Sequence, residues 1–133
     1  IQAYTSETEK FDTQKNTSDY IILWMWDPDC DDCVELTPKL NEFYRQFHET
    51  YNFEVYAISV TPDLDRWNQF IAEHDITWQN ATYGFGMPNY DVVDYFDILT
   101  TPAVFLLDKN HKIIARHFSL DDIYEIFSQL SNN

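Results

Sequence analysis

The sequence predicts an α/β fold, in which a central sheet of mostly parallel or mixed strands is flanked by helices. Two apolar, β-prone runs at 20–26 and 53–60 have the composition of strands that are covered on both faces. Between these runs, apolar residues recur at helical spacing, and a helix there can join two neighbouring parallel strands. Later strand-like runs and a final amphipathic segment predict a C-terminal β-hairpin and helix.

The first part of the chain divides into a lead-in and a helix-bearing core. Residues 1–18 are polar and have few apolar residues to anchor them, so we expect an irregular lead-in followed by a single domain at 19–133. The first helix begins at the cysteines, and Pro38 inside it should kink it. Its buried stripe consists of Leu40, Phe43, Tyr44, Phe47 and Tyr51.

The second half of the chain alternates short elements. Residues 61–63 open a short helix, and a short strand at 76–78 and another short helix at 90–97 follow. Runs at 103–107 and 112–116 are joined by a turn and predict the hairpin. A start that resembles a capping box then opens the last helix, whose buried stripe is Ile123, Ile126, Phe127 and Leu130.

The charge balance excludes some classes of partner. The chain has eight Lys and Arg against 23 Asp and Glu, which gives a formal net charge of −15. Nucleic acids are bound through clustered basic residues, so this composition argues against nucleic-acid binding and favours a neutral or basic protein partner. Hydrophobic residues make up 44% of the chain, which is enough for a globular core.

Neither a membrane span nor a leader is recognisable. No apolar stretch approaches the roughly 20 residues that a spanning helix needs. The chain begins at Ile1 without methionine or a signal-like apolar region, so we expect a mature fragment whose signal region, or an anchor, lies outside this sequence.

The only two cysteines are Cys30 and Cys33, and they stand between the first strand and the first helix. A pair at this spacing can cycle between dithiol and disulfide, because one thiolate attacks a partner and the other resolves the mixed disulfide. Half of a zinc site has the same spacing, but the sequence has no second pair of ligands to complete it. A structural cysteine pair without chemistry remains an alternative.

The order of elements, together with two motifs, resembles the thioredoxin fold over about residues 19–130. The motifs are 26–33 followed by Pro38, and the stretch 101–113 that begins Thr-Pro-Ala-Val-Phe-Leu-Leu. They resemble those of the bacterial cell-envelope thiol-disulfide oxidoreductases of the TlpA/ResA type. The resemblance implies an exported periplasmic or cell-envelope enzyme that reduces or isomerises disulfides, with protein thiols or disulfides as substrates and an upstream thiol as electron donor.

The resemblance also implies roles for individual residues. Cys30 would be the nucleophile and Cys33 the resolving thiol, and a sulfur at a helix N-terminus is favoured as thiolate. Pro102 would be cis and lie against the sulfurs, while Thr101 backbone groups would pair with an extended substrate. Taken alone, Pro102 is equally consistent with an ordinary proline at the entry to a strand. Neither a metal nor a cofactor beyond the cysteine pair is expected.

Residues around the cysteines are expected to support the site. They are Trp26, as an aromatic wall beside the sulfurs, and Pro28, Asp29, Asp31 and Asp32.

Three positions depart from the family pattern. Asp29 stands before the first cysteine, where tryptophan is frequent, and Trp24 occupies the place of a buried aspartate. Leu36 replaces a glutamate three residues after the second cysteine. Glu35 is one position away, which on a helix is a rotation of about 100°. The proton-handling group is therefore not identified by the sequence.

The acidic residues near the cysteines lead to a hypothesis about the direction of the reaction. Asp27, Asp29, Asp31 and Asp32 disfavour a further negative charge on Cys30, so we expect a reductant or isomerase and not a strong oxidant. Acidic residues in a first turn also simply stabilise a helix. A calcium loop is not expected, since Asp32 stands where glycine is needed and Pro38 where glutamate is needed.

The same fold could also serve as a copper chaperone or as a non-catalytic binding module. A copper chaperone would need distant histidine ligands, for which His111 and His117 are the candidates. A non-catalytic binding module would use the cysteine pair as a structural clip and the acidic face to recruit a partner.

Overall fold

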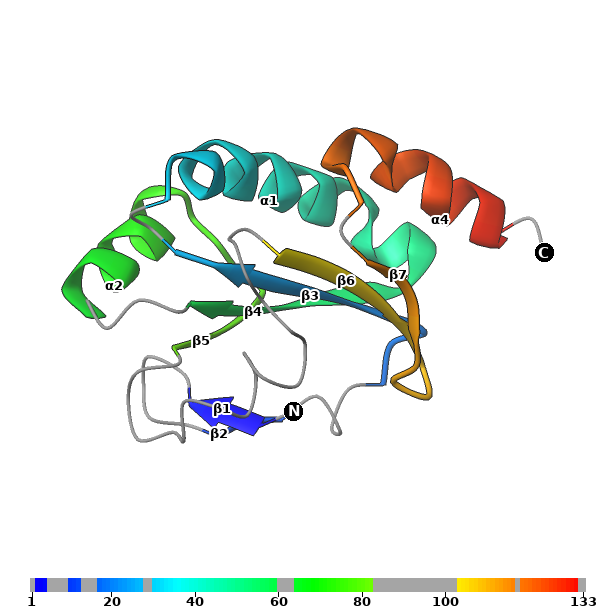
Figure 1. The fold of residues 1–133 in the computed structure, drawn as a ribbon, viewed down its shortest axis with the longest axis horizontal. Coiled ribbons are helices and arrows are strands. Elements are labelled where there is room, and N and C mark those ends of the chain that lie inside the picture. Colours follow the sequence, from blue (N-terminus) through cyan, green and yellow to red (C-terminus); the bar gives the residue numbers. More distant parts are fainter. Residues whose placement is uncertain are drawn as a thin grey trace.

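The computed structural model describes residues 2–4, 10–12, 17–27, 30–59, 64–82, 103–116 and 118–131. The elements in chain order are β1 (Gln2–Tyr4), β2 (Lys10–Asp12), β3 (Tyr20–Trp26), α1 (Asp31–Tyr51), β4 (Phe53–Ser59), α2 (Leu64–Glu73), β5 (Gln79–Thr82), β6 (Ala103–Asp108), β7 (Ile113–Arg116), the 3₁₀ helix η2 (Leu120–Asp122) and α4 (Ile123–Ser131). Within the described ranges, seven strands form one sheet in the order β2-β1-β5-β4-β3-β6-β7 (Figure 1).

The centre of the sheet is formed by β3 and β4, as predicted. These strands pair in parallel over their whole length, from Tyr20 opposite Phe53 to Trp26 opposite Ser59. On the other side of β3, β6 runs antiparallel and forms a hairpin with β7, which confirms the C-terminal hairpin. The sheet is therefore mixed, and the expected α/β class is confirmed.

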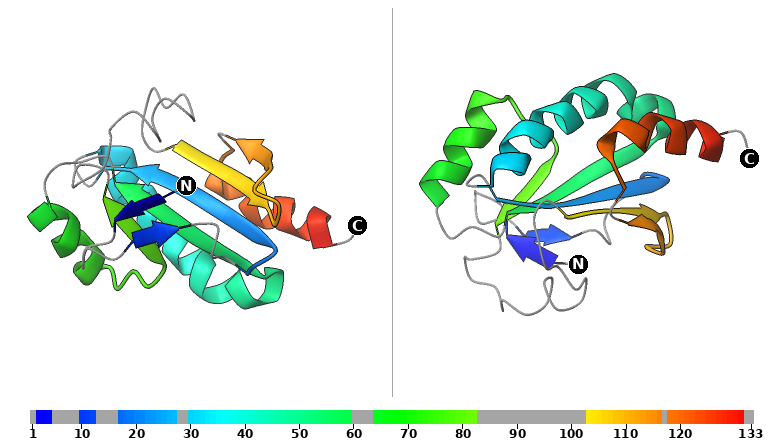
Figure 2. Two further views of the ribbon diagram at one scale, coloured as in Figure 1. Left: turned by 90° about the horizontal axis from the view of Figure 1, so that it is seen from below. Right: turned by 45° about the horizontal axis from the view of Figure 1, so that its top comes forward.

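The helices α1, α2 and α4 lie on the same face of the sheet (Figures 1 and 2). Alternate residues of β3 point toward them, and their side chains join one apolar cluster with the buried faces of the helices. The alternating set on the opposite face, Ile21, Leu23 and Met25, is also buried. Burial on both faces explains why this strand reads as a continuous apolar run.

The helix α1 carries the predicted stripe. Leu40 and Tyr44 are buried, and Phe43, Phe47 and Tyr51 pack against the cluster. The helix continues through Pro38 and ends at Asn52, which adopts a left-handed conformation and donates its backbone N–H to His48 O. The carbonyl of Asn52 accepts from the backbone of Asp19 and Tyr20, so the end of α1 is tied to the start of β3.

Two segments differ from the sequence-based expectation. Within 1–18, expected to be irregular, β1 and β2 pair antiparallel. β1 also pairs with β5, so β2 is the edge strand on this side of the sheet. The strand expected at 76–78 lies instead at β5, which pairs in parallel with β4. Backbone pairing with neighbouring strands produces β1, β2 and β5, and their polar sequences do not reveal it. The short helix expected after residues 61–63 is present as α2, although 61–63 themselves lie outside the described residues. The helix expected at 90–97 also lies outside them.

The last helix begins as predicted. The hydroxyl of Ser119 accepts from the backbone N–H of Asp121 at 3.2 Å and caps η2, which continues into α4. Ile123 and Phe127 of α4 are buried against the cluster, and Ile126 and Leu130 pack at its margin.

We expect Tyr44→Phe to reveal a pH-dependent contribution to stability. The phenol of Tyr44 donates to Glu54 Oε1, and burial, followed by this bond, raises the pKa of Tyr44 well above its usual value. Because the folded-state pKa is the higher one, the contribution is complete below the unfolded pKa of about 10 and is lost as the pH rises further. Denaturant unfolding should therefore show a loss of about 1–3 kcal/mol in Y44F at neutral pH, shrinking above about pH 10.

Tyr124→Phe is the matched control, since Tyr124 is 54% exposed. A difference between wild type and Y44F that stays constant into the alkaline range would contradict this interpretation of Tyr44.

Candidate functional site

The cysteine pair lies at the point where β3 ends and α1 begins. Cys30 is the N-cap of α1 with an extended backbone, and its sulfur accepts from the backbone N–H of Cys33 at 3.3 Å. Its own N–H donates to Asp27 O at 3.0 Å, and its carbonyl accepts from Val34 N at 2.9 Å. The sulfur thus occupies the cap position, where the N–H groups of the first turn have no partner within the helix.

The two sulfurs differ in access to solvent. Both side chains are thiols in this structure, and Cys33 is fully buried in the apolar cluster while Cys30 is partly exposed. A partner molecule can therefore reach Cys30 and not Cys33. This asymmetry fits an attacking thiol in front and a resolving thiol behind it.

Two buried aromatic side chains, Trp26 and Phe70, belong to the same apolar cluster as Cys33. Trp26, the last residue of β3, is fully buried, and its ring lies 5.0 Å from that of Phe70 on α2. Phe70 in turn contacts the ring of His74, at 4.3 Å between centroids. Trp26 lies at the end of β3, and its role as a wall beside the sulfurs stays a prediction. Its contact with Phe70 of α2 has no signal in the sequence around the cysteines.

The first turn of α1 carries two of the predicted acidic residues. Asp31 and Asp32 are exposed there and lie beside the positive end of the helix dipole. Pro28, Asp29, Thr101 and Pro102 lie outside the described residues, so their expected roles remain predictions.

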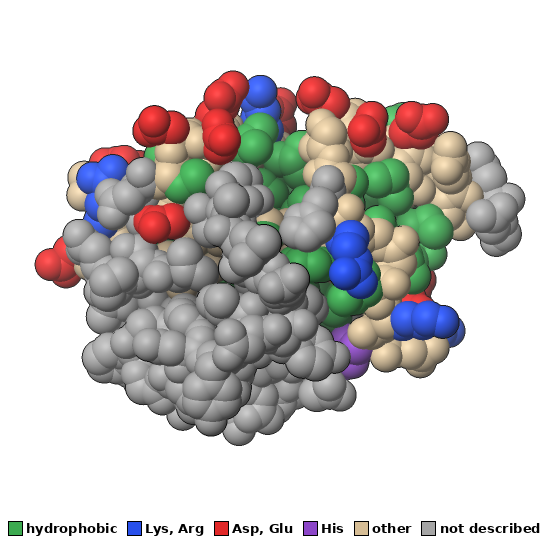
Figure 3. Space-filling model, in the orientation of Figure 1, with side chains coloured by type: hydrophobic (Ala, Val, Ile, Leu, Met, Phe, Trp, Pro, Cys, Tyr) green, Lys and Arg blue, Asp and Glu red, His purple; other side chains and the backbone are tan. Residues whose placement is uncertain are grey.

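The acidic residues continue along the helix surface. Figure 3 shows Asp and Glu side chains gathered over α1 and α4. The exposed ones are Asp31, Asp32, Glu35, Glu42 and Glu49 on α1, and Asp121, Asp122 and Glu125 on η2 and α4. This acidic ridge, defined by those eight residues, begins at the cysteine pair.

None of the carboxylates on α1 is buried, so none of them takes the place of the buried carboxylates that the family resemblance implies. Trp24 donates its indole N–H to the Thr37 hydroxyl at 3.0 Å, and both side chains are buried. Glu35 is exposed and forms an ion pair with Lys39, 3.7 Å away. Glu35 therefore points away from the interior, as its position on the helix predicts.

Two hollows flank α1 close to the cysteines. One of about 420 Å³ lies between α1, β6 and the turn before α4, and it is lined by Trp24, Leu36 and Val104. The other, of about 220 Å³, lies between α1 and α2 and is lined by Val34 and Phe70. Val34 is 41% exposed for an apolar residue, directly after Cys33. The surface beside the pair is thus partly apolar on both sides of the helix.

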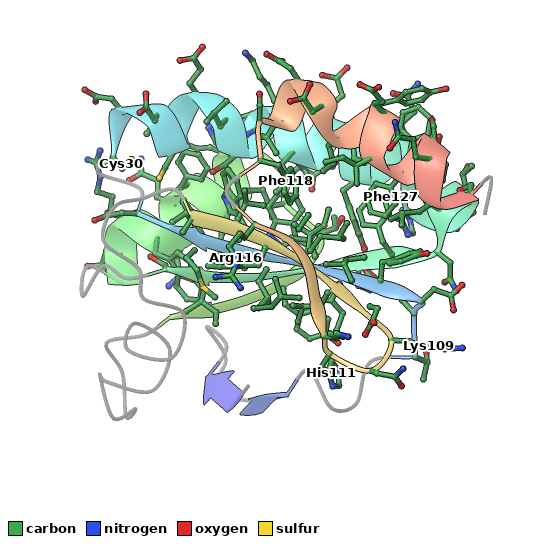
Figure 4. The ribbon with its side chains drawn as sticks, turned by 45° about the vertical axis from the view of Figure 1, so that its right-hand side comes forward. Cys30, Lys109, His111, Arg116, Phe118 and Phe127 are labelled. Atoms are coloured by element: carbon green, nitrogen blue, oxygen red, sulfur yellow. The ribbon has the colours of Figure 1, made fainter. Side chains whose placement is uncertain are left out.

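The described part of the chain offers neither a metal cluster nor a membrane-spanning helix. There, no group of three His, Cys, Asp or Glu side chains is arranged to hold a metal ion. His111 lies in the turn between β6 and β7, at the far end of the sheet from Cys30 (Figure 4). The structure therefore does not bring this copper-ligand candidate to the cysteines, and His117 lies outside the described residues. No helix in these ranges has the length and apolarity to cross a membrane.

The sequence matches a family model described as thioredoxin-like over residues 18–113. Among solved structures, a thioredoxin domain of a thiol-disulfide oxidoreductase from Bacteroides vulgatus is 22% identical, with a TM-score of 0.83, covering 98% of this chain and 91% of that chain. A domain of a possible thiol-disulfide isomerase from Cytophaga hutchinsonii is 24% identical, with a TM-score of 0.86, covering 99% of this chain and 88% of that chain. A secreted disulfide oxidoreductase from Mycobacterium tuberculosis is 15% identical, with a TM-score of 0.78, covering 97% and 95%. No curated protein matches the sequence.

We expect neutralising the first turn to raise the reactivity of Cys30. Replacing Asp31 and Asp32 by asparagine removes two negative charges beside the sulfur and keeps the cap hydrogen bond from Cys33 N. The fraction of Cys30 present as thiolate at neutral pH should rise about two- to fivefold, as measured by thiolate ultraviolet absorbance.

The matched control is Glu42→Gln with Glu49→Gln, which removes two exposed charges from the same helix far from its N-terminus. An unchanged or smaller thiolate fraction in D31N/D32N would show that these carboxylates do not govern Cys30.

Proposed function

This chain belongs to the thioredoxin-like family, and from that premise we propose that it is a thiol-disulfide oxidoreductase that cycles Cys30 and Cys33 between dithiol and disulfide. One observation carries the proposal: Cys30 Sγ caps α1 and accepts from the N–H of Cys33, whose own side chain is buried behind it. A sulfur that accepts hydrogen bonds from a helix N-terminus is favoured as thiolate, which is the reactive form.

The reaction follows from the difference in access. The Cys30 thiolate attacks a disulfide of a partner protein, forming a bond between Cys30 Sγ and one partner sulfur and releasing the other partner sulfur, which takes up a proton. Cys33, having lost its proton, then attacks Cys30 Sγ. The mixed disulfide breaks, the second partner sulfur leaves as a thiol, and Cys30–Cys33 becomes a disulfide. The partner gains two electrons, and an upstream thiol donor restores the dithiol.

Thr101 and Pro102 belong to the same proposed site. For Thr101 and Pro102 we propose the roles that the family resemblance implies, with a cis Pro102 against the sulfurs and the Thr101 backbone as the partner of an extended substrate. We propose Trp26 as the wall behind the pair, which its burial against Phe70 supports. Pro28 and Asp29 are proposed as supporting residues of the same site, and neither a metal nor another cofactor takes part in the proposed reaction.

The preferred direction is reduction or isomerisation. Asp31 and Asp32 oppose the stabilising effect of the helix N-terminus on a thiolate, so the dithiol form is less stabilised than in a strong oxidant. The acidic ridge beside Cys30 favours neutral or basic protein partners (Figure 3). We propose that the protein is located in the bacterial periplasm or cell envelope and acts on exported proteins. The similar structures named thiol-disulfide oxidoreductases come from bacteria, which supports a bacterial enzyme.

A binding module is the second candidate, and the acidic ridge is the observation in its favour. In a module of this kind, the cysteine pair is a structural clip. Cys30 then matters for stability, and binding of a partner does not depend on it.

We expect Cys30→Ser and Cys33→Ser to fail in different ways. C30S removes the exposed nucleophile and should abolish reduction of an insulin-type protein disulfide in a turbidity assay. C33S keeps the nucleophile but lacks the resolving thiol, so it should accumulate a mixed disulfide with the substrate, visible on a non-reducing gel.

The control is wild-type protein alkylated at its thiols, which should resemble C30S in turnover. Full activity in C30S would contradict the proposed enzyme, and retained partner binding with no activity in wild type would favour the binding module.

A further inference from the structure

A buried hydrogen bond joins the interior side of α1 to β3, and it has no role in the reaction proposed above. Trp24 Nε1 of β3 donates to Thr37 Oγ1 of α1 at 3.0 Å, and these side chains are 1% and 0% exposed. At Trp24 and Leu36, where the family resemblance implies buried carboxylates, this chain has uncharged side chains. The Trp24–Thr37 hydrogen bond thus joins β3 to α1 within the described interior, close to these two positions.

Thr37 lies one helical turn beyond Cys33. Residues four apart on an α-helix share a face, with their Cβ atoms about 5–6 Å apart, and Cys33 is fully buried as well. In helices, side chains lean toward the N-terminal turn, so the Thr37 side chain lies over the turn that contains Cys33. Trp24 and Cys33 also belong to the same cluster of buried side chains.

The hydrogen-bonding capacity of Thr37 then points toward the cysteine. A threonine hydroxyl has one proton to donate and two lone pairs, and here one lone pair is occupied by the indole N–H. Trp24 occupies one lone pair of the oxygen, so the hydroxyl proton remains available to an acceptor in the preceding turn of the helix. The groups there that can accept it are the sulfur and the carbonyl of Cys33.

We propose that Thr37, held in place by Trp24, is a positioning residue that donates to Cys33 Sγ and stabilises its thiolate when it resolves the mixed disulfide. This inference rests on the proposed oxidoreductase function and identifies an uncharged group in the place of the missing carboxylates. Glu35 does not serve instead, because it is exposed and paired with Lys39.

The step is the second half of the cycle. Cys33 loses its proton to solvent, and its thiolate forms a bond with Cys30 Sγ while the bond between Cys30 and the partner sulfur breaks. The partner sulfur leaves with the electron pair of that bond and is protonated. A hydroxyl donor to Cys33 Sγ increases the thiolate fraction at neutral pH, which outweighs the accompanying loss of intrinsic nucleophilicity because the latter follows the pKa with a slope of only about 0.4–0.5.

The test separates attack from resolution with a small chromogenic aromatic disulfide as substrate, in a stopped-flow instrument. Each reduced protein should release the coloured thiol in two phases, the first from attack by Cys30 and the second from resolution by Cys33. Thr37→Val keeps the shape of the side chain and removes the hydroxyl, so it should slow the second phase about fivefold and leave the first unchanged. The pH profile of the second phase should move to higher pH.

Three variants complete the design. Thr37→Ser keeps the hydroxyl and should restore the second phase. Trp24→Phe keeps an aromatic ring but removes the donor N–H together with the pyrrole part of the indole, and it should slow the second phase as T37V does. In T37V/W24F the two effects should not add, because the residues act through one hydrogen bond. Thr50→Val, on the exposed side of the same helix, is the control and should leave both phases intact.

The outcomes are distinguishable. A second phase that is unchanged in T37V, or in W24F if T37V does not fold, overturns the role of Thr37 while leaving the oxidoreductase function standing. Equal slowing of both phases, or loss of stability with no change in the pH profile, assigns Thr37 a structural role only. Absence of the second phase in wild type contradicts the oxidoreductase itself.

Discussion

The site depends on the way the N-terminus of α1 is held at the end of β3. Cys30 ends the loop after a strand that is buried on both faces and caps a helix whose apolar stripe is packed against the same sheet. The strand fixes where the loop ends, and the helix supplies the N–H that meets the sulfur. Because both elements are anchored in the core, the thiol pair is held on a rigid support, with only Cys30 within reach of a partner.

Opposing electrostatic effects act on that sulfur. The helix N-terminus and the Cys33 N–H favour a negative sulfur, whereas Asp31 and Asp32 in the same turn disfavour it. Exposed charges act weakly through water, while hydrogen bonds act at contact distance, so a reactive thiolate and a moderate redox character are compatible. The same acidic residues begin the ridge over α1 and α4, which links the reactivity of the site to its choice of partner (Figure 3).

Most of what positions the site could be predicted from the sequence, because burial leaves a strong pattern. The runs at β3 and β4 and the stripe on α1 follow directly from apolar periodicity, and Cys30 and Cys33 from their spacing. Thr37 was not foreseen, since a lone threonine in a helix has no pattern of its own, although its spacing from Cys33 placed it on the same face. The strands β1 and β5, which extend the sheet beyond β4, could not be predicted because backbone pairing creates them, not side-chain burial.

The reduction potential of the Cys30–Cys33 pair tests the central claim most directly. Wild-type protein equilibrated in glutathione or dithiothreitol buffers can be followed by tryptophan fluorescence, since Trp26 belongs to the same buried cluster as Cys33. We predict a reversible two-electron transition with a potential near or below about −250 mV, as expected for a reductant or isomerase. A potential near about −120 mV would contradict the predicted direction, and a pair that does not titrate would contradict the oxidoreductase function.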